Sequence, residues 1–234
     1  MTMITISVAT QKGGAGKSTH CGAFASYLNY GLHRQVALID ADYPQHNLKK
    51  YRQEEISKLE KNQELARRFE AQGIPGYPIL DCKIEEVGPK LEALKKKGKE
   101  FVFMDVPGTV RVPGVMSRIR QTDFVFVPLE QEEKSLKSSM EFINYLVNDK
   151  EKNQAFVGAF WNRIKASESD LIMRGINSML DEMGIYYFQT TVEDKVFYKR
   201  NEHCTSLFPP AQSRATVLYD EMLEKINEVV TITQ

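Results

Sequence analysis

The chain has 234 residues, 42% of them hydrophobic and 26% charged, and its 31 basic and 31 acidic side chains give a formal net charge of zero. The apolar content suffices for a hydrophobic core, and a neutral chain has no overall charge that would attract nucleic acid or a membrane. No apolar run reaches the roughly 18 residues of a membrane span, and no export signal is visible, so we expect a cytoplasmic protein. The three widely spaced cysteines form no CxxC pair, which argues against a disulfide framework, a zinc site or an iron–sulfur cluster.

Short and nearly continuous apolar runs alternate with helical patterns along the whole chain. Strands are expected at 4–9, 35–39, 101–104, 124–128 and 155–161, with weaker candidates at 77–80 and 186–189. Helices are expected at 18–31, 85–97, 112–121, 134–148, 169–183 and 213–230. Continuous apolar strands are typical of parallel sheets covered on both faces. The pattern therefore predicts a three-layer α/β fold with a mostly parallel sheet, in a single domain over residues 1–234.

The highly charged segment 47–73 departs from this alternation. Its apolar residues are Tyr51, Ile56, Leu59, Leu65 and Phe69. One interpretation is a solvated surface helix, since mixed charges are typical of an exposed helical face. The alternative is a helical arm that binds a partner or responds to nucleotide, because the segment directly follows a pair of aspartates at 40 and 42.

The first expected strand leads into a loop rich in glycine and lysine, which is followed by a helical pattern. Glycine lets backbone N–H groups approach phosphates closely, and the N-terminus of a helix adds further donors and partial positive charge. Lys17 is expected to reach the β- and γ-phosphates, and the Ser18 hydroxyl to ligate Mg²⁺. The predicted ATP-binding residues are Gly13, Gly14, Ala15, Gly16, Lys17, Ser18 and Thr19.

This loop is a variant of the common P-loop pattern, because Gln11 stands at the usual first glycine and Lys12 adds a second lysine. With that variant the sequence resembles the ParA/MinD family of deviant Walker-A ATPases. Other segments also resemble the family: 36–42 ends in Asp-x-Asp, 102–108 is similar to its Walker B strand and switch II, and 123–128 to the strand after it. Asn162-Arg163 resembles the dipeptide that ends a later strand of the family.

The resemblance implies a P-loop NTPase fold and a slow, partner-stimulated ATPase that dimerises when ATP binds. In that comparison Lys17 and the loop amides hold the phosphates, and Lys12 reaches across the dimer to the partner's phosphates. Asp42 orients the attacking water, while Asp40 supports the metal shell. Lysines, a metal and a water-orienting carboxylate are the parts that phosphoryl transfer requires.

The same resemblance implies a metal and a base contact. Ser18 ligates Mg²⁺, and Asp105 and Asp40 act on it through water. Asn162, with Arg163, recognises adenine. Each assignment has a plainer alternative, because an aspartate after a strand is often a helix cap or turn residue, and Asn162-Arg163 is a frequent turn pair.

Two further sequence features bear on the site. Tyr43 separates Asp42 from Pro44, where the family has proline directly after the aspartate, so the role of Asp42 depends on how the loop accommodates the extra residue. The four histidines show no metal-ligand spacing, and we interpret them as incidental.

The cargo that such a switch positions stays open in the sequence. A ParA-type partition or mobile-element transfer ATPase would bind nonspecific DNA as an ATP dimer, associate with the nucleoid and respond to a ParB-type partner. Candidate DNA contacts are Arg163, Lys165, Lys195, Lys199 and Arg200, which a solvated surface explains equally well. A MinD-like membrane-associated ATPase would need a basic amphipathic tail, whereas 220–234 is acidic and polar. A nucleotide-binding scaffold with little turnover is the third possibility.

Overall fold

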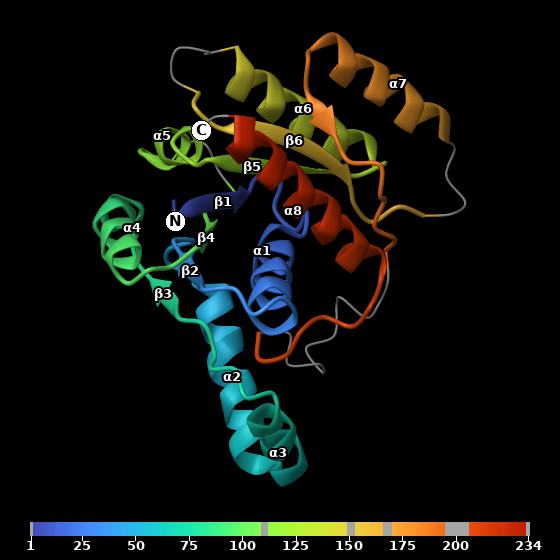
Figure 1. The fold of residues 1–234 in the computed structure, drawn as a ribbon. Coiled ribbons are helices and arrows are strands. Elements are labelled where there is room, and N and C mark those ends of the chain that lie inside the picture. The colour runs from blue at the N-terminus through green and yellow to red at the C-terminus, as the bar shows by residue number, and fades with distance from the viewer. Residues whose placement is uncertain (1, 109–111, 149–152, 166–169, 195–205, 233–234) are drawn as a thin grey trace.

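In the computed structural model, which describes residues 2–108, 112–148, 153–165, 170–194 and 206–232, seven strands form one sheet with parallel pairings throughout. The strand order is β3-β2-β4-β1-β5-β6-β7 (Figure 1). The strands are β1 (Ile4–Val8), β2 (Val36–Asp40), β3 (Ile79–Asp81), β4 (Phe101–Asp105), β5 (Phe124–Leu129), β6 (Phe156–Trp161) and β7 (Tyr186–Tyr187). The parallel sheet expected from the continuous apolar runs is confirmed, and the two weaker candidates are its short edge strands.

Helices cover both faces of the sheet, which confirms the three-layer α/β architecture. One hydrophobic cluster joins the sheet to α1 (Lys17–Ser26), its π-helical continuation η1 (Tyr27–Gly31) and α8 (Arg214–Ile232). The opposite cluster joins it to the 3₁₀ turn η2 (Ile84–Glu86), α4 (Val87–Lys96), α5 (Val115–Arg120), α6 (Glu133–Val147) and α7 (Asp170–Glu182). Of the helices in the described ranges, none combines the length and apolar character that crossing a membrane requires.

The position of β1 in the sheet determines where a ligand can bind. β1 lies at the centre between β4 and β5, so the chain runs outward from it in both directions. The carboxyl ends of the parallel strands meet at one edge, and the loops leaving β1, β2, β4, β5 and β6 are gathered there (Figure 1). In open α/β sheets this edge, at the point where strand order reverses, is where ligands bind.

The charged segment forms two helices, α2 (Asn47–Lys61) and α3 (Gln63–Ala71), which project from the rest of the molecule (Figure 1). The expectation of a single surface helix is therefore wrong in detail. Asn62 has an extended backbone, with φ −128° and ψ 100°, and its side chain caps α3 by accepting the Leu65 N–H at 3.1 Å. An asparagine that caps a second helix interrupts the first one.

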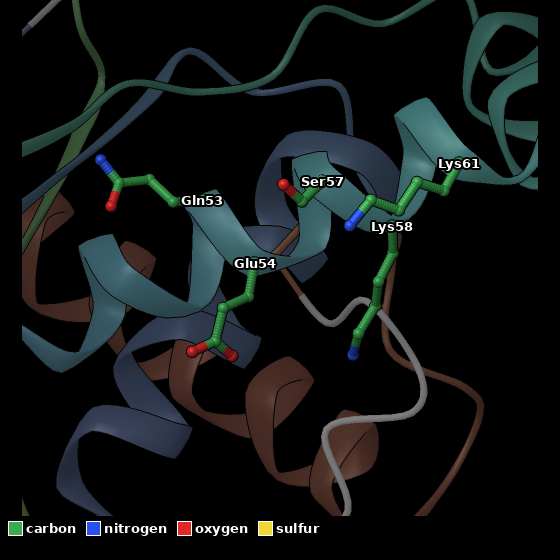
Figure 2. A pocket seen from close by; sticks show the side chains of 5 residues that line it. All are labelled: Gln53, Glu54, Ser57, Lys58 and Lys61. Atoms are coloured by element: carbon green, nitrogen blue, oxygen red, sulfur yellow. The ribbon is translucent and has the colours of Figure 1, made fainter.

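The base of this arm is fixed to the body through Ser206. Arg52 Nε donates to the Ser206 hydroxyl at 2.8 Å, and the Ser206 N–H donates to Glu55 Oε2 at 3.0 Å. Glu55 is buried, and burial raises the pKa of its carboxyl, with the Ser206 hydrogen bonds opposing the shift. A hollow on the outer side of α2 is lined by Gln53, Glu54, Ser57, Lys58 and Lys61 (Figure 2). None of the predicted site residues lines it.

Candidate functional site

The glycine-rich loop joins the carboxyl end of β1 to the first residue of α1. Two glycines have backbone conformations that other residues rarely adopt, with φ of 77° at Gly14 and 88° at Gly16. Gly13 and Gly14 are exposed, and a Cβ on either would meet no atom within 4 Å. A Cβ on Gly16 would lie 2.9 Å from Nδ2 of Asn162. The loop therefore has open backbone on its outer side and close packing against Asn162 on its inner side.

Lys17 is the first residue of α1 and is buried within the loop. Its ammonium donates to the Lys12 main-chain carbonyl at 2.7 Å. Burial lowers the pKa of Lys17, while the negative charges of Asp105 and Asp42 act in the opposite direction. Ser18 is half-buried and Thr19 is exposed. The Lys17 side chain thus binds back to the start of its own loop, and its amine lies near the carboxylates of Asp105 and Asp42.

Asp40 and Asp105 lie directly side by side at the ends of adjacent strands. The two residues are register partners of β2 and β4, and the N–H of Ala41 donates to the Asp105 carbonyl at 2.8 Å. Both side chains are buried, at 0% and 1% exposure. Asp40 Oδ2 accepts the N–H of Lys49 at 3.0 Å, so one of its oxygens caps the first turn of α2.

The remaining carboxylate oxygens of this pair have no hydrogen-bond partner among the described residues: Asp40 Oδ1 and both oxygens of Asp105. Burial raises the pKa of Asp105 to about 7, the Asp40 and Asp42 charges add to that shift, and the nearby Ser18 hydroxyl and the Lys17 ammonium oppose it. Buried carboxylates without partners are costly unless a cation or its hydration water satisfies them. These oxygens fit a hydrated divalent cation such as Mg²⁺.

Asp42 lies on the loop after β2, beside the buried pair. It is half-buried, and burial raises the pKa of its carboxyl, with the Asp40 charge acting in the same direction. Its main-chain carbonyl accepts the N–H groups of Gln45 at 2.8 Å and His46 at 2.9 Å. The extra residue, Tyr43, is thereby accommodated at the exposed tip of a turn, with 56% of its surface accessible.

Lys12 is held by two carboxylates of its own chain. Its ammonium lies 2.9 Å from Glu130 Oε2 and 2.8 Å from Glu132 Oε2. Partial burial works against the charge, but the hydrogen bonds to Glu132 and Glu130 outweigh it, and the pKa of Lys12 is raised. Glu130 is itself buried and accepts the Ser135 hydroxyl at 2.6 Å. The side chain of Lys12 therefore binds Glu130 and Glu132, while its main-chain carbonyl binds the ammonium of Lys17.

Glu130 and Glu132 were not among the residues expected at the site. They follow β5 directly, just as Asp40 and Asp105 end β2 and β4. The rule that polar residues after parallel strands gather at one edge applies to all of them. That signal was present in the sequence, although nothing in it indicated Lys12 as their partner.

Asn162 directly follows β6 and lies beneath the loop. It is buried, and its Nδ2 donates to the Ala15 carbonyl at 3.0 Å. Its Oδ1 lies 3.1 Å from Nε2 of His20, whose Nδ1 lies 3.0 Å from the Tyr219 hydroxyl. Burial lowers the pKa of His20 to about 4, so the ring is neutral near pH 7. The interpretation of His20 as incidental is therefore wrong, because it is a buried hydrogen-bonding residue within the site.

The basic residues proposed for DNA are only partly placed by the structure. Arg163 Nη1 lies 3.2 Å from Glu130 Oε1, so its charge is partly neutralised within the chain. The exposed Lys165 donates its main-chain N–H to Gln131 Oε1 at 3.2 Å. Lys195, Lys199 and Arg200 lie outside the described residues.

A central parallel sheet with a glycine-rich loop between β1 and α1 is an α/β fold of the P-loop NTPase type. The sequence profile of the CobQ/CobB/MinD/ParA nucleotide-binding domain matches residues 6–202. The chain belongs to this family, as the resemblance of its motifs predicts. No curated protein sequence gives a significant match to it.

Solved structures of this family share the fold. A ParA-family ATPase from Chlorobium tepidum has a TM-score of 0.63 and 14% identity, with 94% of this chain and 98% of that chain covered. The MinD cell division protein from Aquifex aeolicus has a TM-score of 0.61 and 18% identity, covering 94% and 97%. A McdA variant from Cyanothece in complex with ATP has a TM-score of 0.60 and 18% identity, covering 95% and 96%. At such identities the likeness concerns the fold.

Proposed function

We propose that this chain is a Mg-ATP-dependent ATPase switch that dimerises on nucleotide and positions or segregates DNA. The observation that carries the proposal is the placement of two lysines on one loop. Lys17 is buried beside the carboxylates, whereas Lys12 is held further out by Glu130 and Glu132. One buried and one more exposed lysine on the same loop suit a site in which the first acts on the bound phosphates and the second on a partner subunit.

The phosphates of ATP are assigned to the loop amides of residues 13–18 and to Lys17. Lys17 would exchange the Lys12 carbonyl for a phosphate oxygen, which is a charge-assisted and therefore stronger contact. Phosphoryl transfer depends mainly on positioning and on neutralising charge, and a buried ammonium close to the reacting phosphate supplies both. The exposed Thr19 contributes at most from the outer side of the helix.

The metal is assigned to Ser18, with Asp105 and Asp40 acting through bound water. Both oxygens of Asp105 and Oδ1 of Asp40 lack a hydrogen bond among the described residues, which supports this assignment, and His46 Nδ1 lies 3.6 Å from that Asp40 oxygen. When bound, Mg²⁺ supplies positive charge that stabilises the phosphate oxygens. The second Asp40 oxygen remains on the Lys49 N–H and so links the metal shell to the first turn of α2.

Asp42 is assigned to orient the attacking water. Its half-buried carboxyl is close enough to Asp40 and Asp105 for their charges to interact, and the turn at Gln45 and His46 holds its backbone in place. The Tyr43 insertion favours a second candidate, a regulatory scaffold that binds ATP with little turnover. A measured hydrolysis rate above that of an Asp42→Asn variant separates the two.

Dimerisation is assigned to Lys12. Nucleotide held between two subunits shifts the population toward the dimer, and hydrolysis releases it. Within one chain Lys12 already has two carboxylate partners, so its transfer to a partner's phosphates exchanges one set of charge-assisted contacts for another. Such an exchange makes the switch reversible.

DNA is the cargo we propose, with a ParB-type protein as the stimulating partner. Two neighbouring structures are described as plasmid partition proteins of Borrelia burgdorferi, which supports a ParA-type role. The alternative is a MinD-like ATPase that acts at a membrane or on a protein cargo, and MinD is also a structural neighbour.

Binding to a random-sequence duplex tests this choice of cargo. Anisotropy of labelled DNA should rise with protein and ATP, fail to rise without nucleotide, and fall steeply with salt as counterion release requires. Lys199→Ala combined with Arg200→Ala should weaken binding, whereas Lys95→Ala combined with Lys96→Ala, on exposed positions of α4, should not. Binding that is independent of ATP or insensitive to salt would exclude the DNA role and leave the other cargoes.

A further inference from the structure

A chain of hydrogen bonds joins α8 to the phosphate loop through the buried Asn162. The Tyr219 hydroxyl lies 3.0 Å from His20 Nδ1, and His20 Nε2 lies 3.1 Å from Asn162 Oδ1. Asn162 Nδ2 then donates to the Ala15 carbonyl at 3.0 Å. Tyr219 belongs to α8, His20 to α1 and Ala15 to the loop, while Asn162 follows β6. The hydrogen-bond chain therefore connects four separate parts of the protein.

We call this chain of hydrogen bonds from Tyr219 to Ala15 the relay. Which group donates each of its hydrogen bonds follows from the Ala15 carbonyl at its end. The Ala15 carbonyl only accepts, so the group facing it must be the Asn162 NH₂, and the Asn162 oxygen must face His20. An oxygen without a proton requires an N–H donor, which places the His20 proton on Nε2. The bare Nδ1 then accepts the hydroxyl of Tyr219. A neutral imidazole satisfies both contacts in this tautomer only.

Rings on both sides hold the relay in place. The His20 ring meets Phe160 edge to face at 4.9 Å, and the Tyr219 ring stacks on Phe24 at 4.8 Å with an interplanar angle of 8°. His20 and Tyr219 are 5% and 1% exposed. Aromatic contacts of this kind fix ring orientation in addition to burying area. The His20 donor therefore faces Asn162 in a single, packed orientation.

We propose that His20 and Tyr219 are positioning residues that hold the Asn162 amide in the orientation that pairs with adenine, and so set the preference for ATP over GTP. The inference rests on the proposed assignment of Asn162 to the base. After its contacts with Ala15 and His20, the amide keeps one N–H and one oxygen lone pair for a ligand.

The chemistry of the two purines explains the selectivity. On the edge that carries N7, adenine presents an acceptor and the N6 amino donor, which an asparagine amide can match with two hydrogen bonds. Guanine presents two acceptors, N7 and O6, on the same edge. An amide whose oxygen is held toward the six-position meets the donor of adenine and opposes the O6 of guanine. Ala15 and His20 both oppose a turned-over amide, so breaking the relay removes one of the two restraints and weakens the distinction.

Removal of a single hydroxyl tests the relay without removing a ring. Tyr219→Phe keeps the ring that stacks on Phe24 and deletes the hydroxyl that donates to His20. Tyr27→Phe is the matched control, because the Tyr27 hydroxyl also joins the α1–η1 segment to α8, through Asp220, but lies outside the relay. Affinities of the full-length chain for ATP and GTP are measured by competition against a fluorescent ATP analogue, and thermal melts of both variants check folding.

We expect Tyr219→Phe to lower ATP affinity about 3- to 10-fold and to leave GTP affinity unchanged. This fold-change corresponds to the net free energy of one neutral hydrogen bond. Tyr27→Phe should leave the ATP-to-GTP ratio as in the wild type. His20→Leu should reduce the preference most, because only the Ala15 carbonyl then orients the amide, while His20→Gln, which keeps an N–H donor, should retain more of it. An unchanged ratio in Tyr219→Phe, or equal losses in the two His20 variants, would overturn the proposal.

Two further readouts separate this inference from the proposed function. Nitrogen NMR of the imidazole should show the Nε2–H tautomer in the wild type, and an Nδ1–H tautomer would overturn the relay whatever the nucleotide data. If the wild type binds no ATP, the proposed function fails. If it binds ATP and GTP equally, ATP binding stands while the adenine role of Asn162, and with it this inference, fails.

Discussion

The Lys17 ammonium donates a hydrogen bond to the main-chain carbonyl of Lys12, at 2.7 Å. The amine that is assigned to the phosphates is therefore bound to the loop that is to surround them. Burial lowers the pKa of Lys17, and the charges of Asp105 and Asp42 are the largest effects that oppose this shift. The contact holds the Lys17 side chain inside the site. To bind a phosphate, Lys17 would only need to exchange the Lys12 carbonyl for a phosphate oxygen.

Lys17→Ala should reduce ATP affinity by about two orders of magnitude, because a charge-assisted contact to phosphate contributes up to about 3 kcal/mol. Isothermal titration calorimetry with ATP and Mg²⁺ measures the loss. Lys96→Ala, on an exposed position of α4, is the control and should bind as the wild type does. Retained affinity in the Lys17 variant would remove the phosphate-loop assignment.

Lys12→Ala should spare ATP binding and abolish ATP-dependent dimerisation, which light scattering measures directly. The lysine is bound by Glu130 and Glu132 within its own chain, so its loss leaves the buried Glu130 with Ser135 and Arg163 as remaining partners. The cost to folding should accordingly be modest, about 1 kcal/mol or less. A variant that still forms dimers with ATP would contradict the cross-subunit role.

Asp105→Asn should distinguish the role of Asp105 in metal binding from its effect on folding stability. Both oxygens of Asp105 are buried without partners among the described residues, so the neutral amide should leave the nucleotide-free protein as stable or more stable by about 1–2 kcal/mol. In the wild type, ATP should stabilise the fold more with Mg²⁺ than without it. In Asp105→Asn this Mg²⁺-dependent gain should disappear.

Thermal melts with ATP, with and without Mg²⁺, check that expectation for Asp105→Asn. Asp181→Asn, an exposed position on α7, is the matched control and should keep the full Mg²⁺-dependent gain. If Asp105→Asn melts at the wild-type temperature in Mg-ATP, the carboxylate has no part in the metal site.

Much of the fold could be predicted from the sequence because its information is local. Five strands are buried on both faces, and such strands need nearly continuous apolar residues, which the sequence shows directly. These strands are β1, β2, β4, β5 and β6. The break in the charged segment was missed, since Asn62 reads as one more polar residue among many. Its capping role is visible only once the Leu65 N–H is seen to need an acceptor.

The site was predictable where a motif carries the chemistry and unpredictable where the contact is between distant residues. The placement of the loop glycines and of Asp105 at the same edge of the sheet follows directly from local patterns. The partners of Lys12 are more than a hundred residues away along the chain, and His20 meets Tyr219 across 199 residues. Periodicity and spacing contain no information on such pairs, so a histidine without metal-ligand spacing was interpreted as incidental.

Glu100 joins β2 and β4 at the edge of the sheet opposite the site. Its carboxylate accepts Arg34 Nε and Nη2, each at 3.1 Å, and the Gln35 N–H at 2.8 Å. The Arg34 hydrogen bonds are the main cause of a pKa of Glu100 below its usual range, with partial burial acting against them. A carboxyl whose pKa is lower in the folded than in the unfolded state stabilises the fold above the unfolded value.

Glu100→Gln should therefore cost about 1–2 kcal/mol at pH 7, because it weakens a bidentate charged contact. The wild type should lose that contribution as pH falls below about 5, through the unfolded pKa of about 4.3 and then through the lower folded pKa of Glu100, while the variant should not. Urea unfolding across this range measures the difference. Glu92→Gln, exposed on α4, should follow the wild type, and a Glu100→Gln curve parallel to the wild type would show that Arg34 does not favour the ionised carboxylate.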